Sequence, residues 1–173
     1  MQAYDHGIVD MSCGRVTVIS AYNTSTAYKL GGQGDVNAVN SGTAYVQGGE
    51  ATNIHARDMG HVYMSDGQTY RLHAIGSGHL HISGGQASIL YARDTSTTTF
   101  NAREFSLGMG LSLDGDRVLG TGSLSGEWHD GEPWTISIRA HDSGATVRLI
   151  PEPATLSLLT LGGLAIMRRR RGR

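Results

Sequence analysis

Cysteine, proline and basic residues are scarce in this chain of 173 residues, and each scarcity excludes a class of protein. The single cysteine, Cys13, cannot form an intramolecular disulfide, so a disulfide-stapled domain is excluded. Three prolines beside 25 glycines, without a Gly-X-Y period, exclude collagen. Residues 1–167 hold nine basic against fifteen acidic side chains. Nucleic acid is therefore not expected as a partner, because phosphate binding needs basic side chains along a face.

Signatures of several enzyme classes and of secretion are also missing. The sequence contains no HExxH pair, no nucleophile elbow and no phosphate loop. Its first ten residues are polar and include Asp5 and His6, so they do not form a secretory signal peptide.

The sequence does contain an internal repeat of about eighteen residues. A small-turn triplet recurs with spacings of 17, 18 and 18, and a degenerate copy precedes it at Cys13-Gly14-Arg15. We number each repeat unit from the first residue of its triplet. The clear triplets are Gly31-Gly32-Gln33, Gly48-Gly49-Glu50, Asp66-Gly67-Gln68 and Gly84-Gly85-Gln86.

Four positions of the unit hold small or apolar residues almost throughout, with Lys29 the clearest exception, at position 17. The second unit is one residue short, and the deletion lies before Val36. Position 7 holds Ile19, Val36, Ile54, Leu72 and Leu90; position 9 holds Ala21, Ala38, Ala56, Ala74 and Ala92; position 15 holds Ala27, Ala44, Val62, Leu80 and Thr98; position 17 holds Lys29, Val46, Met64, Ile82 and Phe100.

Apolar residues two apart indicate strands, so each unit is predicted to contain two short strands separated by turns. One unit cannot bury its own apolar face, whereas a stack of units forms a continuous core. The predicted fold is all-β, a narrow β-solenoid of 18-residue coils over residues 1–104. A hexapeptide helix is disfavoured because positions 1 and 13 are not apolar. A calcium β-roll is disfavoured because position 6 reads Asn53, Arg71 and Ile89.

The first residues fit the same register, since Ala3, Val9 and Met11 fall on positions 9, 15 and 17. The chain therefore opens inside a coil, and such an end exposes strand edges. We expect the natural protein to begin further upstream, with more coils and a signal peptide.

After Glu104 the register fades, and residues 105–150 are predicted to form a small β-hairpin cap. Alternating runs at 111–113, 134–138 and 146–150 are separated by Asp-Gly pairs at 114–115 and 130–131. Asp-Gly between such runs is typical of hairpins. Trp128 and Trp134 are the expected core of this cap.

Residues 151–173 have three parts: Pro151-Glu152-Pro153, an uncharged stretch over Ala154–Met167, and a basic end. As a helix the stretch is about 21 Å long at 1.5 Å per residue. That is short for a bilayer core of about 30 Å. The basic end is expected to stay cytoplasmic as a stop. The span residues singled out are Ala154, Leu156, Leu158, Leu159, Leu161, Leu164 and Ile166, and the basic stop is Arg168, Arg169, Arg170, Arg171 and Arg173.

This arrangement closely resembles the PEP-CTERM sorting signal of exported bacterial proteins. The resemblance implies export, anchoring in the inner membrane through a short C-terminal transmembrane helix, and processing by an exosortase-type enzyme as a partner. It also implies association with exopolysaccharide and biofilm matrix at the cell surface or outside the cell. The stretch from Leu124 to Trp134 is similar, more weakly, to the region before this signal in solenoid proteins of planctomycete-like bacteria.

Position 16 is predicted to point outward, because positions 15 and 17 point inward. It holds Tyr28, Tyr45, Tyr63 and His81 in consecutive coils, which we call the tyrosine strip. Coils stack at about 4.8 Å, so the rings are predicted to form a ladder. The ladder either stabilises the solenoid by stacking like residues, or offers a strip for a glycan or another partner.

Two further patterns are weighed against simpler explanations. His55 with His73, and His61 with His79, occupy equivalent outward positions, but no carboxylate or cysteine completes a metal site, so neither metal nor cofactor is expected. Asp58 and Asp94 share position 11 two coils apart, a separation near that of an inverting glycosidase pair. Both fall in turns, where Arg-Asp neighbours are usually solvated.

The sequence therefore predicts an exported, non-catalytic protein of the cell surface or extracellular matrix, structural or adhesive in role. The alternative is a polysaccharide-active β-helix enzyme, a lyase or glycosidase.

Overall fold

The computed structural model describes residues 1–142 and 144–151, and this part contains strands and turns but no helix. The strands are β1 Gln2–Ala3, β2 Ile8–Met11, β3 Arg15–Tyr22, β4 Thr26–Lys29, β5 Gln33–Val39, β6 Thr43–Asp58, β7 His61–Gly76, β8 His79–Ile82, β9 Gln86–Ala92, β10 Thr97–Ala102, β11 Glu104–Leu107, β12 Leu111–Asp114, β13 Arg117–Gly120, β14 Gly122–Glu127, β15 Pro133–His141 and β16 Thr146–Pro151.

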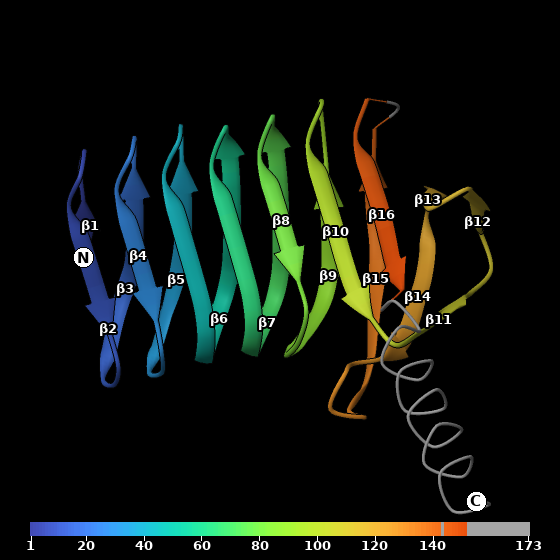
Figure 1. Cartoon of the computed structure of the whole chain (residues 1–173), viewed down its shortest axis with the longest axis horizontal. Coiled ribbons are helices and arrows are strands. Elements are labelled where there is room, and N and C mark those ends of the chain that lie inside the picture. Colours follow the sequence, from blue (N-terminus) through green and yellow to red (C-terminus); the bar gives the residue numbers. More distant parts are fainter. Residues whose placement is uncertain (143, 152–173) are drawn as a thin grey trace, which may run out of the picture.

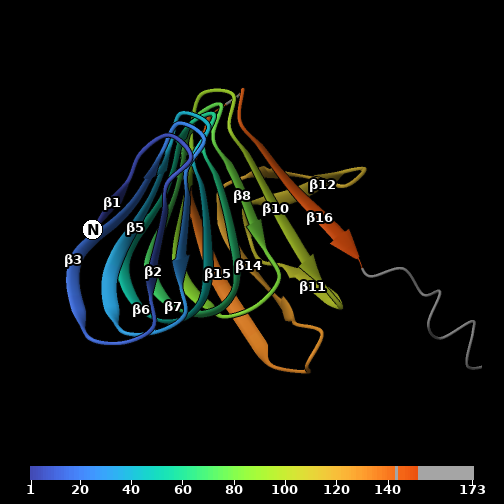
Figure 2. The same cartoon turned by 60° about the vertical axis from the view of Figure 1, so that its left-hand side comes forward.

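The strands form the predicted β-solenoid, and the structure shows that it has about six turns. Its coils follow one another along the long axis, from β1 at the N-terminal end to β16 (Figure 1). Seen nearer to that axis, successive coils lie behind one another (Figure 2). One side stacks β2, β4, β8, β10 and β16, and the other stacks β1, β3, β5, β9 and β15. The long strands β6 and β7 run around the bend and belong to both sides.

The predicted register is confirmed, because residues of the same repeat position pair in parallel. Ile54 of β6 pairs with Leu72 of β7, which pairs with Leu90 of β9. Ala3 pairs with Ala21 and Val9 with Ala27, so the first residues also belong to a coil. The short unit shifts the β5 register between Gln33 and Val36, where the deletion was placed.

The apolar columns face the inside of the solenoid. In the five numbered units all residues at position 7 and all alanines at position 9 are at most 1% exposed. Alanine suits position 9 because the two sides of a narrow coil lie too close for two large columns at native packing density. Lys29 occupies position 17 among these columns and is only 1% exposed, which makes it the largest fully buried side chain of the described residues.

Two turn positions explain why the same small residues recur. At position 11 the backbone is left-handed, with φ of 56° at Asn23, 58° at Asp58 and 60° at Asp94, a conformation that asparagine, aspartate and glycine adopt most readily. At position 13 stand Gly42, Gly60 and Gly78, where a Cβ atom would overlap the carbonyl of the position-9 alanine in the preceding coil. These backbone requirements recur in successive coils, although position 13 holds Ser25 in the first unit and Ser96 in the fifth.

The structure differs from the expected cap over residues 105–150, because β15 and β16 rejoin the solenoid. β15 pairs in parallel with β9, and β16 pairs in parallel with β10 from Thr97↔Thr146 to Ala102↔Pro151. Strands β11 to β14 form an insertion between two solenoid coils. The reason is local, because three apolar residues after the insertion reoccupy the inward columns. Ile138, Val147 and Leu149 are 1%, 0% and 4% exposed.

The insertion covers the edges of that last coil. β14 pairs antiparallel with β15, and β13 pairs antiparallel with β16. β12 and β13 form a hairpin around Gly115, where the first Asp-Gly pair was predicted to turn. Trp134 stacks on both Phe100 and Trp128, with ring centroids 5.2 and 4.6 Å away, so the two tryptophans close the solenoid interior at this end.

Within the described residues no helix is long and apolar enough to cross a membrane. Pro151 is the last residue of β16. Glu152, Pro153, the predicted span and the arginine stop lie outside the described residues.

Candidate functional site

The tyrosine strip forms the ladder that its spacing predicts. Ring centroids are 5.1 Å apart for Tyr28 and Tyr45, 5.2 Å for Tyr45 and Tyr63, and 4.8 Å for Tyr63 and His81, with planes within 16° of parallel. The residues come from β4, β6, β7 and β8, whose parallel pairing places them in one column.

This stacking decides what the strip offers to a ligand. Each ring lies against the next, so the faces between neighbouring rings are covered by protein. Sugars and other apolar ligands bind aromatic residues through the ring face. The strip thus turns mainly ring edges and phenolic hydroxyls outward, and the arrangement supports the stabilising role of the ladder more than the binding role.

Histidines form two further ladders. His61 and His79 stack at 4.7 Å beside the strip, and His55, His73 and Tyr91 stack on the opposite side of the solenoid at 4.5 and 4.9 Å. Sequence reasoning paired His55 with His73 but missed Tyr91, although it holds position 8 of its unit. No group of three metal-binding side chains occurs among the described residues.

Burial, together with the neighbouring His73 and Arg57, lowers the pKa of His55 to about 4. Burial also lowers the pKa of His73, where Arg57, Arg71 and Arg93 act in the same direction. The pKa values of His61 and His81 are lowered by burial and by adjacent imidazoles. The imidazoles of His55, His61, His73 and His81 are therefore neutral at neutral pH.

These shifts predict a loss of stability in mild acid. An imidazole with a lowered pKa takes up its proton in the unfolded chain first, so the folded state loses stability as the pH falls from about 6.5 towards about 4. Replacing both His55 and His73 with asparagine, the residue that holds this column at Asn37, is expected to remove about 1–2 kcal/mol of this loss, since the pair is part-buried. Urea unfolding at pH 7 and at pH 4.5 measures the difference. An identical loss in the wild type and the double variant would contradict it.

Position 11 gives the aspartates Asp58 and Asp94 a structural role. Both have left-handed backbones, and the Asp94 carboxylate accepts a hydrogen bond from the Gly76 amide at 3.1 Å. The same column carries a side-chain ladder at its start, where Asn40 donates to Asn23 and Asn23 donates to Asp5. The column that suggested a carboxylate pair is thus a column of turn residues.

Sequence reasoning also missed a hollow on the outer surface beside repeat position 3. Its rim is the third residue of the recurring triplet, which was interpreted as a turn residue only. The signal was present in the sequence: position 3 holds Arg15, Gln33, Glu50, Gln68 and Gln86, long polar side chains in every unit.

The fold and the ladders together define the class of the molecule, a β-solenoid repeat protein with an antiparallel insertion at its C-terminal end. The PEP-CTERM protein-sorting motif matches residues 149–171. The match includes Pro151, Glu152 and Pro153, the apolar stretch and the arginines up to Arg171. This chain is therefore an exported protein that is sorted by an exosortase and carries a C-terminal membrane-anchoring tail.

The matched motif begins at Leu149, inside β16, so it is continuous with the last solenoid coil. No curated protein and no solved structure matches the chain significantly. The likeness of residues 124–134 to proteins of planctomycete-like bacteria stays a prediction.

Proposed function

We propose that this protein is a non-catalytic structural or adhesive component of the cell surface or extracellular matrix. The observation that supports the proposal best is the direct junction of tail and solenoid. Leu149 is both the first residue of the matched motif and a core residue of the last coil, 4% exposed. What the tail delivers is thus the repeat body itself.

The body has features of a passive scaffold. Its coils are held by parallel backbone pairing along the axis, and ladders of like side chains run along both outer sides. Each coil contacts its neighbours, so the solenoid presents the same surface over a long distance. Such a surface suits repeated contacts with a matrix polymer.

The tail in this proposal inserts residues 154–167 in the inner membrane, with the arginines on the cytoplasmic side. The exosortase acts at the motif, and the body reaches the cell surface or the matrix. Contact with exopolysaccharide there is part of the proposal.

The test uses a bacterium that encodes an exosortase, and the same strain without it. With the exosortase, the full chain is expected in the surface and matrix fractions at a reduced mass. Without it, or with Pro151, Glu152 and Pro153 replaced by alanine, the full-mass chain is expected to stay in the membrane fraction. Equal amounts at the surface in all cases would refute the route.

The rival enzyme function has its own measurement. The full chain in detergent is incubated with matrix glycans, and reducing ends and unsaturated products are quantified. The proposal expects neither product above a no-protein control. Product formation that disappears in the double variant Asp58→Asn and Asp94→Asn would establish the enzyme instead.

A further inference from the structure

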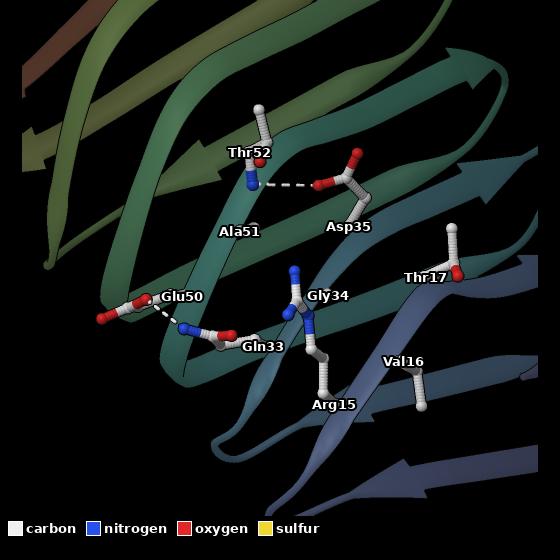
Figure 3. A pocket seen from close by; sticks show the side chains of 9 residues that line it. All are labelled: Arg15, Val16, Thr17, Gln33, Gly34, Asp35, Glu50, Ala51 and Thr52. Atoms are coloured by element: carbon white, nitrogen blue, oxygen red, sulfur yellow. Dashed lines mark hydrogen bonds between the residues drawn. The ribbon is translucent and has the colours of Figure 1, made fainter.

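A groove runs along the outer surface of the solenoid, parallel to its axis. Three hollows of about 690, 360 and 450 Å³ adjoin one another there, and Glu50 lines all three. Gln68 and Gln86 both line the second and third. The volumes fall in the range of about 300–1,000 Å³ that is typical of ligand sites. Figure 3 shows the first hollow, with Arg15, Gln33 and Glu50 along one rim.

Residues at repeat position 4 make the floor of the first and second hollows. Three of them are small, Gly34, Ala51 and Ala87, and they lie between the side chains of position 3 and those of position 5; Val16 and Thr69 complete the floor. A Cβ atom on Gly34 would lie 2.6 Å from the carbonyl oxygen of Val16, so no larger residue fits there without a shift. The depression therefore follows from the sequence of the floor.

The one-residue deletion adds to the first hollow. It interrupts the parallel ladder after Gln33, and the Asp35 carboxylate takes the place of the missing backbone acceptor. It accepts hydrogen bonds from the backbone amides of Thr52 and Asn53, both at 2.9 Å. The short coil is thus stabilised without a backbone segment that would fill the hollow.

The second hollow, of about 360 Å³, contains an aromatic ring that differs from the rings of the tyrosine strip. Tyr70 is 47% exposed and lines the groove. The Arg71 guanidinium lies 4.7 Å from its ring centroid, and within the described residues no other ring stacks on it. An exposed ring supported on one side offers an apolar face to a ligand, which the strip does not.

Around this ring the groove carries hydrogen-bonding groups and little positive charge. In the described part of the chain the Arg15 guanidinium and the Gln68 amide have no hydrogen-bond partner, while Gln33 donates to Glu50 at 2.8 Å. Among the described residues that line the hollows, five carry a carboxylate and Arg15 is the one cation; the carboxylates are those of Asp35, Glu50, Asp66, Asp130 and Glu132. An anionic ligand is repelled by such a lining.

From the ring, the planar polar side chains, the net negative lining and the elongated form, we infer that this groove binds a chain of uncharged sugars lying along the solenoid axis. The rim from Arg15 to Gln86 spans four coil steps, about 19 Å at about 4.8 Å each, which accommodates several sugar rings. The inference rests on the proposed adhesive role and gives that role its ligand class, a neutral polysaccharide.

Affinity electrophoresis of the full chain in mild detergent tests this. The gels contain one neutral polysaccharide each (laminarin, galactomannan, dextran or hydroxyethylcellulose) or an anionic one (alginate or polygalacturonate). Retardation is expected from at least one neutral polymer and from neither anionic polymer. Tyr70→Ala is expected to weaken that binding by about tenfold, the loss of one aromatic contact, and Gln68→Ala by about threefold.

Tyr4→Ala is the matched control, because Tyr4 is 56% exposed but stacks on Tyr22 far from the groove. Its affinity is expected to stay within about twofold of wild type, the size of an effect away from the contact. Circular dichroism verifies that each variant is folded.

Three results would overturn the inference: no retardation by any neutral polymer, tighter binding of an anionic polymer, or unchanged affinity in Tyr70→Ala. Loss of binding only in the triple variant Tyr28→Ala, Tyr45→Ala, Tyr63→Ala would assign the ligand to the strip instead. A protein that reaches the surface through its tail but fails these gels would refute the groove and leave the structural role standing.

Discussion

Replacing Gly60 with alanine is expected to destabilise the solenoid by about 3 kcal/mol or more, a large effect for the addition of one methyl group. Gly60 lies in the turn that precedes β7, and its amide donates to the Arg57 carbonyl at 2.8 Å. A Cβ atom there would overlap the carbonyl of Ala38 in the preceding coil and lie 3.0 Å from the Arg57 carbonyl oxygen. Both are backbone atoms held by parallel pairing, so a Cβ atom here requires this turn to shift away from the preceding coil; Ser25 and Ser96 occupy the same position in turns built around a Cβ atom.

Thermal unfolding of the full chain in detergent measures this, and a fall in midpoint of about 6–12 °C is expected for a domain of this size. Gly115→Ala is the control. Gly115 has φ of 62° in the β12–β13 hairpin but no atom within 4 Å of its would-be Cβ. It is expected to cost only about 1 kcal/mol, from backbone strain alone. Equal losses in the two variants would show that the close approach between coils is not what requires glycine at position 13.

Gly60 also illustrates why the solenoid was predictable from sequence. A residue that contacts the preceding coil is under the same constraint in the next coil, so small residues recur at position 13 with the period of the coils, as Ser25, Gly42, Gly60, Gly78 and Ser96. The alanines of position 9 recur for the same reason, and their pairing, for example Ala56 with Ala74, matches the predicted register. Even the deletion in the second unit could be located, because the columns on both sides of it are intact.

The return of the solenoid after residue 132 was not predictable in this way. The insertion of β11–β14 separates the last coil from the others by more than one period, and β15 carries a register shift between Ile138 and Ala140. Ile138 and Ala140 keep the two-residue spacing of positions 7 and 9 in the sequence, but the shift pairs Ala140 with Tyr91 and places His141 opposite Ala92. Alternation alone, as in Trp134–Ile138, does not distinguish a parallel coil from a hairpin strand.

The candidate site shows a second limit. Spacing placed Tyr28, Tyr45, Tyr63 and His81 in one column, and the structure agrees. Spacing does not tell whether stacked rings keep their faces free, since that depends on side-chain torsions. It also gives no weight to Tyr70, which recurs in no other coil. A residue that contacts a ligand does not have to repeat, so periodicity finds scaffold residues more readily than binding residues.

Among the residues whose burial the structure describes, Lys29 is the one ionisable side chain in the buried columns. Its replacement by methionine is expected to stabilise the protein by about 2–3 kcal/mol at pH 7. Its ammonium donates to the carbonyls of Gly31 and Gly32 at 3.2 and 2.8 Å. Two carbonyls do not replace the hydration of a full charge. Methionine matches the shape of the lysine stem and already occupies this column at Met11 and Met64.

The pH dependence of that gain identifies its cause. Burial lowers the pKa of Lys29, while Glu50 raises it to a smaller extent. The charged form is thus disfavoured in the folded chain, and the wild type recovers stability as the pH rises through the lowered pKa towards the unfolded value of about 10.4. The advantage of Lys29→Met, measured by urea unfolding, is therefore expected to shrink between pH 7 and pH 10. Lys29→Ala removes the same charge but leaves a cavity, so it is expected to gain less. A destabilised Lys29→Met at pH 7 would show instead that the carbonyl-bound ammonium stabilises the turn between β4 and β5 by more than its burial costs.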